Sequence, residues 1–225
     1  MALQGGGTIW LSQLRDEFGN WGPPVWLSHY YRGALTTGNN LGVPTGGWIS
    51  LGHFFGTQRS VAGSWSRTSP GTYTFTVPVH STLRIDVRGA GGGGGGSTYD
   101  AGAAGQNGTA GGAATVSGTG LRGNGGSAGQ GSYYNKPGKA TNGSASGGNT
   151  LNSSGGGADG GVGGTYGATK GGDGGDGGRA VSDWGAGSIG AGAQLTVTVP
   201  SGGTGGAGQV RGANGGNGAV YISWT

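Results

Sequence analysis

Residue types that could support catalysis or metal binding are few in this sequence. Histidine occurs only at His29, His53 and His80. His29 and His53 occupy the same position of a short repeat, which favours a structural role over ligation or catalysis. No Ser/His/Asp arrangement or carboxylate pair with a catalytic context accompanies them. We therefore expect that the protein is not an enzyme.

Residues 171–178 read GGDGGDGG, and this stretch invites comparison with a calcium-binding repeat. Such repeats place a large aliphatic residue after Gly-Gly-x-Gly-x-Asp-x, whereas this sequence has Gly178 there and no second copy in register. Residues 91–96 read GGGGGG, but the Lys-Ser/Thr of a phosphate-binding loop does not follow. The sequence thus predicts no metal site and no cofactor, and it places Asp173 and Asp176 on an outer, solvent-facing edge.

Glycine dominates the second part of the chain and is regularly spaced there. Of the 64 glycines, 50 lie in residues 89–225. A period of three residues is typical of the polyproline-II helix, which rises ~3.1 Å per residue. Short runs without proline argue against collagen, and strands on both sides argue against a flexible linker. We expect a bundle of short polyglycine-II helices, from runs that begin at Gly102, Gly120, Gly157, Gly171, Gly202 and Gly212.

The elements that must hold this bundle are β-strands at its two ends. Alternating, β-branched stretches predict strands within about 72–88, at 194–200 and at 219–224. The expected fold is therefore mostly irregular and β: a sandwich of polyglycine-II helices capped by a few strands. Ten of the nineteen aromatic residues lie in residues 1–65, which predicts a small N-terminal module there and a glycine-rich domain at 66–225.

The N-terminal module contains a faint repeat. IWLSQL begins at Ile9, VWLSHYYRG at Val25 and ISLGHFFG at Ile49. Ser12 and Ser28 are suitable helix N-caps, since a serine hydroxyl accepts a hydrogen bond from a free backbone N–H. One interpretation is a small core built by three similar turns. A second is that three similar elements match three equivalent sites on a trimeric partner, and both can hold.

Gaps between the glycine runs hold most of the remaining aromatic and charged residues. These gaps, at 97–101, 132–142, 165–170 and 179–184, are predicted loops. Local packing would account for them, but exposed Tyr and Trp beside Lys and Arg are also typical of protein-binding surfaces. The candidate binding residues are Tyr99, Tyr133, Tyr134, Lys136, Tyr166, Lys170, Arg179, Asp183 and Trp184.

Charge and hydropathy exclude two further classes of partner. The net charge is +4, but the basic residues are scattered, so we expect no nucleic-acid binding. No apolar run approaches the ~20 residues that cross a bilayer, so we expect no membrane insertion. The start, MALQGGGTIW, carries no visible secretory signal, which predicts synthesis in a host cytoplasm.

Two stretches resemble a known family. LGVPTGGWISLGHFFGTQRS (41–60) is similar to the attachment segment of the distal-tip adhesins of T-even-like bacteriophage long tail fibres, in which Leu-Gly-Val-Pro precedes a Trp-x-Ser element. GTIWLSQLRDEFG, which starts at Gly7, and the later LSHYYRG resemble a short motif common in phage virion proteins. The specific resemblance covers about residues 1–60, and the glycine-rich body is similar in style.

The resemblance implies host recognition at the distal tip of a tail fibre in the virion. It implies that the N-terminal module docks on a trimeric fibre and that loops between polyglycine-II helices bind an outer-membrane receptor, with a protein favoured, of a Gram-negative host. Two other classes stay open: a virion or baseplate decoration protein without adhesive function, and an ice-binding polyglycine-II protein. The docking candidates are Trp10, Trp26, Trp48, Ile49 and Ser50.

Overall fold

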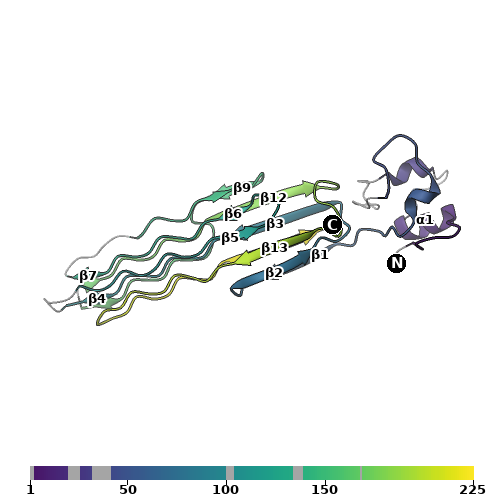
Figure 1. The fold of residues 1–225 in the computed structure, drawn as a ribbon. Coiled ribbons are helices and arrows are strands. Elements are labelled where there is room, and N and C mark those ends of the chain that lie inside the picture. Colours follow the sequence, from purple (N-terminus) through teal and green to yellow (C-terminus); the bar gives the residue numbers. More distant parts are fainter. Residues whose placement is uncertain (1–2, 20–25, 32–41, 100–103, 134–138, 168) are drawn as a thin grey trace.

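The computed structural model describes residues 3–19, 26–31, 42–99, 104–133, 139–167 and 169–225. In these residues the fold is mostly β, with antiparallel sheets and few helical turns. Three parts follow one another along a long axis: an N-terminal module, a pair of β-sheets, and a set of extended glycine-rich segments (Figure 1). No helix among the described residues is long and apolar enough to span a bilayer.

The described residues of the N-terminal module form three short helical elements around an aromatic core. These are α1 (Leu11–Phe18) and two 3-10 turns, η1 (Leu27–Tyr30) and η2 (Leu51–Phe54). The rings of Phe18, Tyr30 and Phe54 are fully buried, and their centroids form a nearly equilateral triangle with sides of 6.1, 6.1 and 6.3 Å. Each helical element therefore contributes one ring to a common centre.

The sequence repeat corresponds to these three elements, but its caps differ from the expectation. Trp10, Trp26 and Ser50 are the N-cap residues, whereas Ser12 and Ser28 lie inside the helical turns. Each N-cap N–H is bonded instead by the side chain three residues later, which is Gln13, His29 or His53, at 2.8, 3.5 and 3.0 Å. The prediction that Ser12 and Ser28 are N-caps was wrong, because α1 and η1 begin at Leu11 and Leu27, one residue before each serine.

Two five-stranded antiparallel sheets form the middle of the molecule. One has the order β1-β14-β3-β12-β9 and the other β2-β13-β5-β6-β8. The bounds of the first sheet are β1 Gly63–Arg67, β14 Ala219–Trp224, β3 Thr82–Arg88, β12 Arg179–Gly185 and β9 Leu151–Ser153. Those of the second are β2 Gly71–Thr76, β13 Gln194–Val199, β5 Ala114–Val116, β6 Arg122–Gly123 and β8 Ala145–Ser146.

Alternating side chains from both sheets form one apolar core. In β3, Leu83, Ile85 and Val87 are fully buried, and they pack with residues of the second sheet such as Val197. Strands occur where alternation predicted them, at β2, β3, β13 and β14. β1 begins at Gly63, so the last residues of the range expected for the N-terminal module belong to a sheet.

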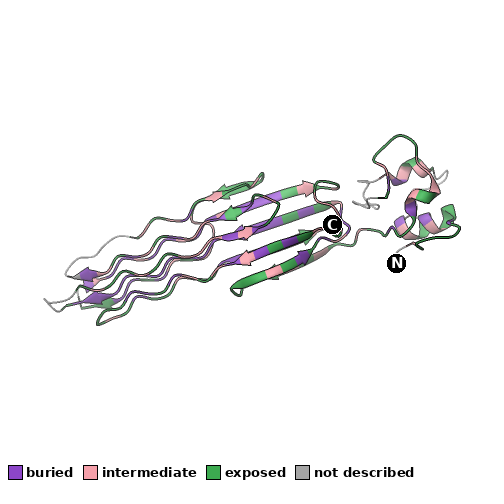
Figure 2. Ribbon diagram, viewed as in Figure 1, coloured by how far each residue is buried: buried purple, intermediate pink, exposed green. Residues whose placement is uncertain are grey.

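The strands continue directly into the glycine-rich segments, which extend away from the N-terminal module (Figure 1). β3, for example, leads into residues 89–97, all of which are buried (Figure 2). Short strand pairs lie at the distal end of these segments, where the chain turns back: parallel β4 (Ser97–Thr98) and β7 (Ser132–Tyr133), and antiparallel β10 (Thr165–Tyr166) and β11 (Thr169–Lys170). We call this distal end the tip.

Candidate functional site

Residues 89–97, the central segment, donate their backbone N–H groups to three different neighbours in rotation. Gly92 donates to Gly175 O at 2.8 Å and Gly93 to Thr109 O at 2.8 Å. The next residue, Gly94, donates to the third neighbour, and the residue after it returns to the first. The direction of bonding therefore turns once every three residues, and all three accepting segments run antiparallel to the central one.

The carbonyl groups of the central segment use three further neighbours. Gly92 O accepts from Gly161 N at 2.7 Å, and the next two carbonyls accept from Gly129 N and Gly206 N, both at 2.8 Å. These three segments run parallel to the central one. Six ring segments thus surround it, each bonded to the next around the ring; in ring order they are 171–178, 124–132, 104–112, 201–208, 210–218 and 156–164.

This arrangement requires glycine at every position of residues 91–96. A Cβ atom built on any of them would lie between 1.8 and 2.3 Å from a backbone oxygen of a neighbouring segment. None of these glycines has a positive φ, so close approach rather than an unusual backbone conformation explains them. The hexaglycine stretch, whose sequence does not fit a phosphate-binding loop, is the centre of the bundle.

The ring segments need glycine where their backbone approaches a neighbouring segment closely, and at several positions this neighbour is the central segment. A Cβ on Gly105, Gly108 or Gly111 would lie 2.2 to 2.3 Å from an oxygen of the central segment. Gly171 and Gly174 approach it equally closely, with Cβ distances of 2.1 Å. The period of three in the sequence therefore marks positions of close backbone approach, some to the central segment and others, such as Gly160 and Gly163, to another ring segment.

Asp173 and Asp176 accept backbone hydrogen bonds at the outer edge of the bundle. Asp173 Oδ1 accepts the Gly163 N–H at 2.7 Å, and Asp176 Oδ1 accepts the Gly160 N–H at 2.8 Å. Lys170 pairs with Asp173, and Lys139 pairs with Asp176. The side chains are 33% and 19% exposed, so the expectation of solvent-facing carboxylates holds only in part.

Charge and hydrogen bonds shift the titration of both groups in the same direction. Burial raises the pKa of Asp173, but the Gly163 N–H and the Lys170 ammonium outweigh it, so the pKa lies below its usual 3.8. For Asp176, burial is likewise outweighed by Lys139 and the Gly160 N–H, and its pKa is also lowered.

On another edge of the bundle, two asparagines accept backbone N–H groups in the same way but without charge. Asn214 accepts the Gly205 N–H at 2.8 Å, and Asn217 accepts the Gly202 N–H at 3.0 Å.

We expect Asp173→Asn/Asp176→Asn to cost less stability than Asp173→Ala/Asp176→Ala. Asparagine can still accept the two backbone N–H groups, whereas alanine leaves each without a partner, at about 1–3 kcal/mol per group. Because the folded pKa values are lowered, the carboxylates stabilise the fold fully above their usual 3.8, and this contribution is lost as the pH falls through the lower folded values.

Urea unfolding at pH 7 and pH 3 measures both effects. The parent protein should lose more stability on acidification than the Asn variant. Asp86, whose pKa is also lowered, leaves a remaining pH dependence common to both. Equal losses in the two proteins would contradict the role assigned to the carboxylates.

The tip brings two of the predicted binding residues together. The rings of Tyr99 and Tyr166 lie 6.4 Å apart, and the residues are 52% and 42% exposed. The backbone N–H of Tyr99 is held by Gln209 Oε1 at 2.9 Å. In the neighbouring strands β4 and β7, the hydroxyls of Ser97 and Ser132 are buried without a hydrogen-bond partner. An exposed aromatic pair is thus the main feature of the described part of the tip.

The other residues predicted to lie on the loops at 132–142 and 165–170 are only partly described by the structure. Tyr133 ends β7 at the tip, while Tyr134 and Lys136 lie outside the described residues. Lys170 lies near the tip and pairs with Asp173 at 3.0 Å.

The expectation of a loop at residues 179–184 was wrong, because they form strand β12 between β3 and β9. Arg179 bonds Asp86 through two nitrogens at 2.9 and 2.8 Å. Asp183 pairs with Arg84, and Trp184 packs against the sandwich core. These residues lie away from the tip.

The docking candidates of the N-terminal module divide into exposed and structural residues. Trp10, Trp26 and Trp48 are 65%, 61% and 81% exposed, although each is a large apolar side chain. Ile49 packs against the module core and Ser50 caps η2. The indoles are therefore available for contact, while the other two candidates support the fold.

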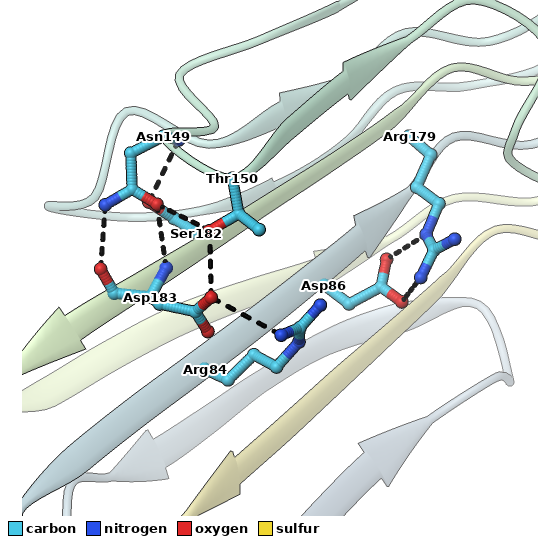
Figure 3. Close-up of polar contacts among 7 residues, drawn as sticks. All are labelled: Arg84, Asp86, Asn149, Thr150, Arg179, Ser182 and Asp183. Atoms are coloured by element: carbon cyan, nitrogen blue, oxygen red, sulfur yellow. Dashed lines mark hydrogen bonds and ion pairs between the residues drawn. The ribbon is translucent and has the colours of Figure 1, made fainter.

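A polar cluster on the outer face of the first sheet was not found from the sequence. The alternation of TLRIDVR, residues 82–88, places Arg84, Asp86 and Arg88 on the face opposite the core. Figure 3 shows Asp86 held by Arg179, and Asp183 held by Arg84 and Thr150. That alternation was the available signal, since it predicts which charges share a face.

No family model matches this chain, and no match was found among the curated proteins or the solved structures.

Proposed function

We propose that this protein is the receptor-binding tip of a bacteriophage tail fibre. The observation that carries the proposal is the exposed pair of Tyr99 and Tyr166 at the end of the molecule farthest from the N-terminal module. Aromatic side chains dominate the energetics of protein interfaces, and residues displayed on loops of a rigid scaffold are the usual means of recognition. The resemblance of residues 1–60 to tail-fibre adhesins supports the same function.

We further propose that the glycine-rich segments are polyglycine-II helices. Support comes from the hydrogen bonds of residues 89–97, whose donors turn through three neighbours and repeat every third residue. A helix with three residues per turn and no internal hydrogen bonds presents its backbone groups in this rotation. The closest contacts are between backbone atoms of different segments, which only glycine permits.

Such a bundle is suited to a molecule that must hold its binding loops at a fixed distance from its attachment module. Each described segment is tied to several others by backbone hydrogen bonds, so bending one segment requires breaking bonds to its neighbours. The shape of the scaffold is therefore set by backbone hydrogen bonds and does not depend on the side chains displayed at the tip. Changes in the loops can then alter the bound receptor without changing the scaffold.

The N-terminal module would dock on the trimeric fibre. Three similar helical elements surround one aromatic core, and among the described residues of the module three indoles are exposed. Tryptophan is enriched among the residues that contribute most to interface affinity, so exposed indoles are suitable for contact with a partner. Three similar elements can contact three equivalent surfaces of a trimer, which predicts one copy of this protein per fibre.

Competition for adsorption tests the receptor-binding function. Purified protein should reduce phage adsorption to host cells as its concentration rises, because it occupies the receptor. The variant Tyr99→Ala/Tyr166→Ala should compete at least about thirtyfold more weakly, since interface hot spots contribute about 2 kcal/mol or more each.

Leu151→Ala is a matched control for that variant. Leu151 is 37% exposed and lies on β9, away from the tip, so its loss should not change competition. Unfolding temperatures of all three proteins verify the fold. Absence of competition by the parent protein would point to a decoration protein and overturn the proposal.

A further inference from the structure

A shallow hollow of about 240 Å³ lies on the outer face of the first sheet. Strand pairing aligns Ser64 with Ser223, and Ser223 with Arg84, across β1, β14 and β3. The next row aligns Ser66, Tyr221 and Asp86 in the same way. These side chains line the hollow together, far from the tip.

Arg84 has unused hydrogen-bonding capacity at this hollow. Its Nη1 contacts Asp183 at 3.3 Å, and the side chain is 51% exposed. A guanidinium carries five N–H donors, so most of them are open to a ligand. Asp183 is itself fixed by Thr150 and by Asn149, whose Nδ2 donates to its carbonyl at 2.7 Å (Figure 3). The guanidinium is therefore oriented while its donors remain available.

The carboxylate of Asp86 lies in the hollow, but its charge is neutralised and does not repel an anion. Asp86 is bonded by Arg88 at 2.9 Å and by Arg179 at 2.8 Å, so two positive charges offset its one negative charge. With Arg84 and Asp183 included, three guanidiniums face two carboxylates. The local charge is positive, and it favours an anionic group bound beside Arg84.

The remaining lining suits a sugar ring. Tyr221 is 38% exposed, and Arg88 Cζ lies 4.7 Å from its ring centroid. Tyr221 lines a neighbouring hollow together with Arg88, and it also lines the Arg84 hollow. The hydroxyls of Ser64, Ser66 and Ser223 can donate and accept hydrogen bonds, as the hydroxyls of a saccharide require.

We propose that this hollow binds an acidic sugar residue of a glycan chain. Its carboxylate pairs with Arg84, its ring lies beside Tyr221, and its hydroxyls bond the serines. The volume is below the ~300–1,000 Å³ of pockets for drug-sized ligands, so one ring fits and the rest of the chain lies along the open sheet. The site is separate from the tip, and the proposal does not depend on the tip binding a receptor.

NMR titration of the full chain tests the site with three probes: the methyl glycoside of glucuronic acid, the methyl glycoside of glucose, and inorganic phosphate. The glucuronide should shift signals of Ser64, Ser223 and Tyr221 at millimolar concentration. Arg84→Gln should weaken its binding about tenfold, the equivalent of one charge-assisted contact. Arg122→Gln, a matched control on the other sheet whose Nε contacts Asn124, should leave binding unchanged.

Each other outcome overturns the proposal. Equal binding of phosphate would leave an anion site without a role for the sugar ring, and equal binding of the glucoside would remove the role of Arg84. Unchanged binding in the Arg84→Gln variant would place the ligand elsewhere. Absence of shifts with any probe would reject the site. Because adsorption plays no part in this titration, its failure is distinguishable from a failure of the function proposed for the tip.

Discussion

Replacing Gly93 with alanine is expected to prevent the glycine bundle from closing. The added Cβ would lie 2.0 Å from Thr204 O and 2.4 Å from Thr204 C. Both atoms are backbone, and Thr204 O already accepts the Thr109 N–H at 2.9 Å, so moving it breaks another contact. We expect a loss of about 4–5 kcal/mol or more, at the far end of the range for single substitutions.

Two graded variants keep this prediction testable if the Gly93 variant fails to fold. A Cβ on Gly216, in a ring segment, would meet its nearest atom, Ala158 Cβ, at 3.3 Å, and one on Gly185 would meet nothing within 4 Å. Urea unfolding should therefore rank Gly185→Ala as near neutral, Gly216→Ala as mildly destabilised and Gly93→Ala as severe. A Gly93 variant as stable as the Gly185 variant would contradict the close packing of the central segment.

The sequence predicted those parts of the fold whose cause is local. Glycine at every third residue reflects the close approach of a ring segment to its neighbours. Because the need for glycine recurs at a fixed spacing along the backbone, it is visible in the sequence. Strands β2, β3, β13 and β14 were predictable because their side chains alternate between the core and solvent.

What could not be predicted depends on partners distant in the sequence. Nothing local to residues 91–96 indicates that six other segments surround them. β12 was mistaken for a loop because Ala180, Val181 and Ser182 are all buried, so its pattern does not alternate. Its position between β3 and β9 is fixed by pairing with residues far along the chain.

For the candidate site, the sequence predicted which residues lie in gaps between glycine runs, but not at which end of the molecule each gap lies. Tyr99 and Tyr166 lie in separate gaps of the glycine pattern, and both gaps proved to be at the tip because the segments that precede them, 89–97 and 156–164, run parallel. Arg179, by contrast, follows directly after a glycine run yet belongs to the proximal end. Without the chain direction of each segment, the sequence could not tell distal gaps from proximal ones.

Removing the three indoles that are exposed in the described part of the N-terminal module is expected to abolish attachment to the fibre while leaving the module folded. Trp10, Trp26 and Trp48 are exposed by 65%, 61% and 81%, so alanine at these positions removes little of the core. Tryptophan is enriched among interface hot spots, where truncation costs about 2 kcal/mol or more. Each loss should therefore weaken binding by about thirtyfold, and the triple variant should show no retention on immobilised trimeric fibre.

Two controls separate loss of contact from loss of structure. Val61→Ala removes another exposed apolar side chain, 66% exposed, and should bind as the parent does. Phe54→Ala empties the module core and should lose about 3–5 kcal/mol of that module's stability, so it unfolds the module and binds poorly for a different reason. If the triple indole variant has a parental circular dichroism spectrum and still binds the fibre, the attachment surface lies elsewhere, and three similar helical turns serve only to build the core.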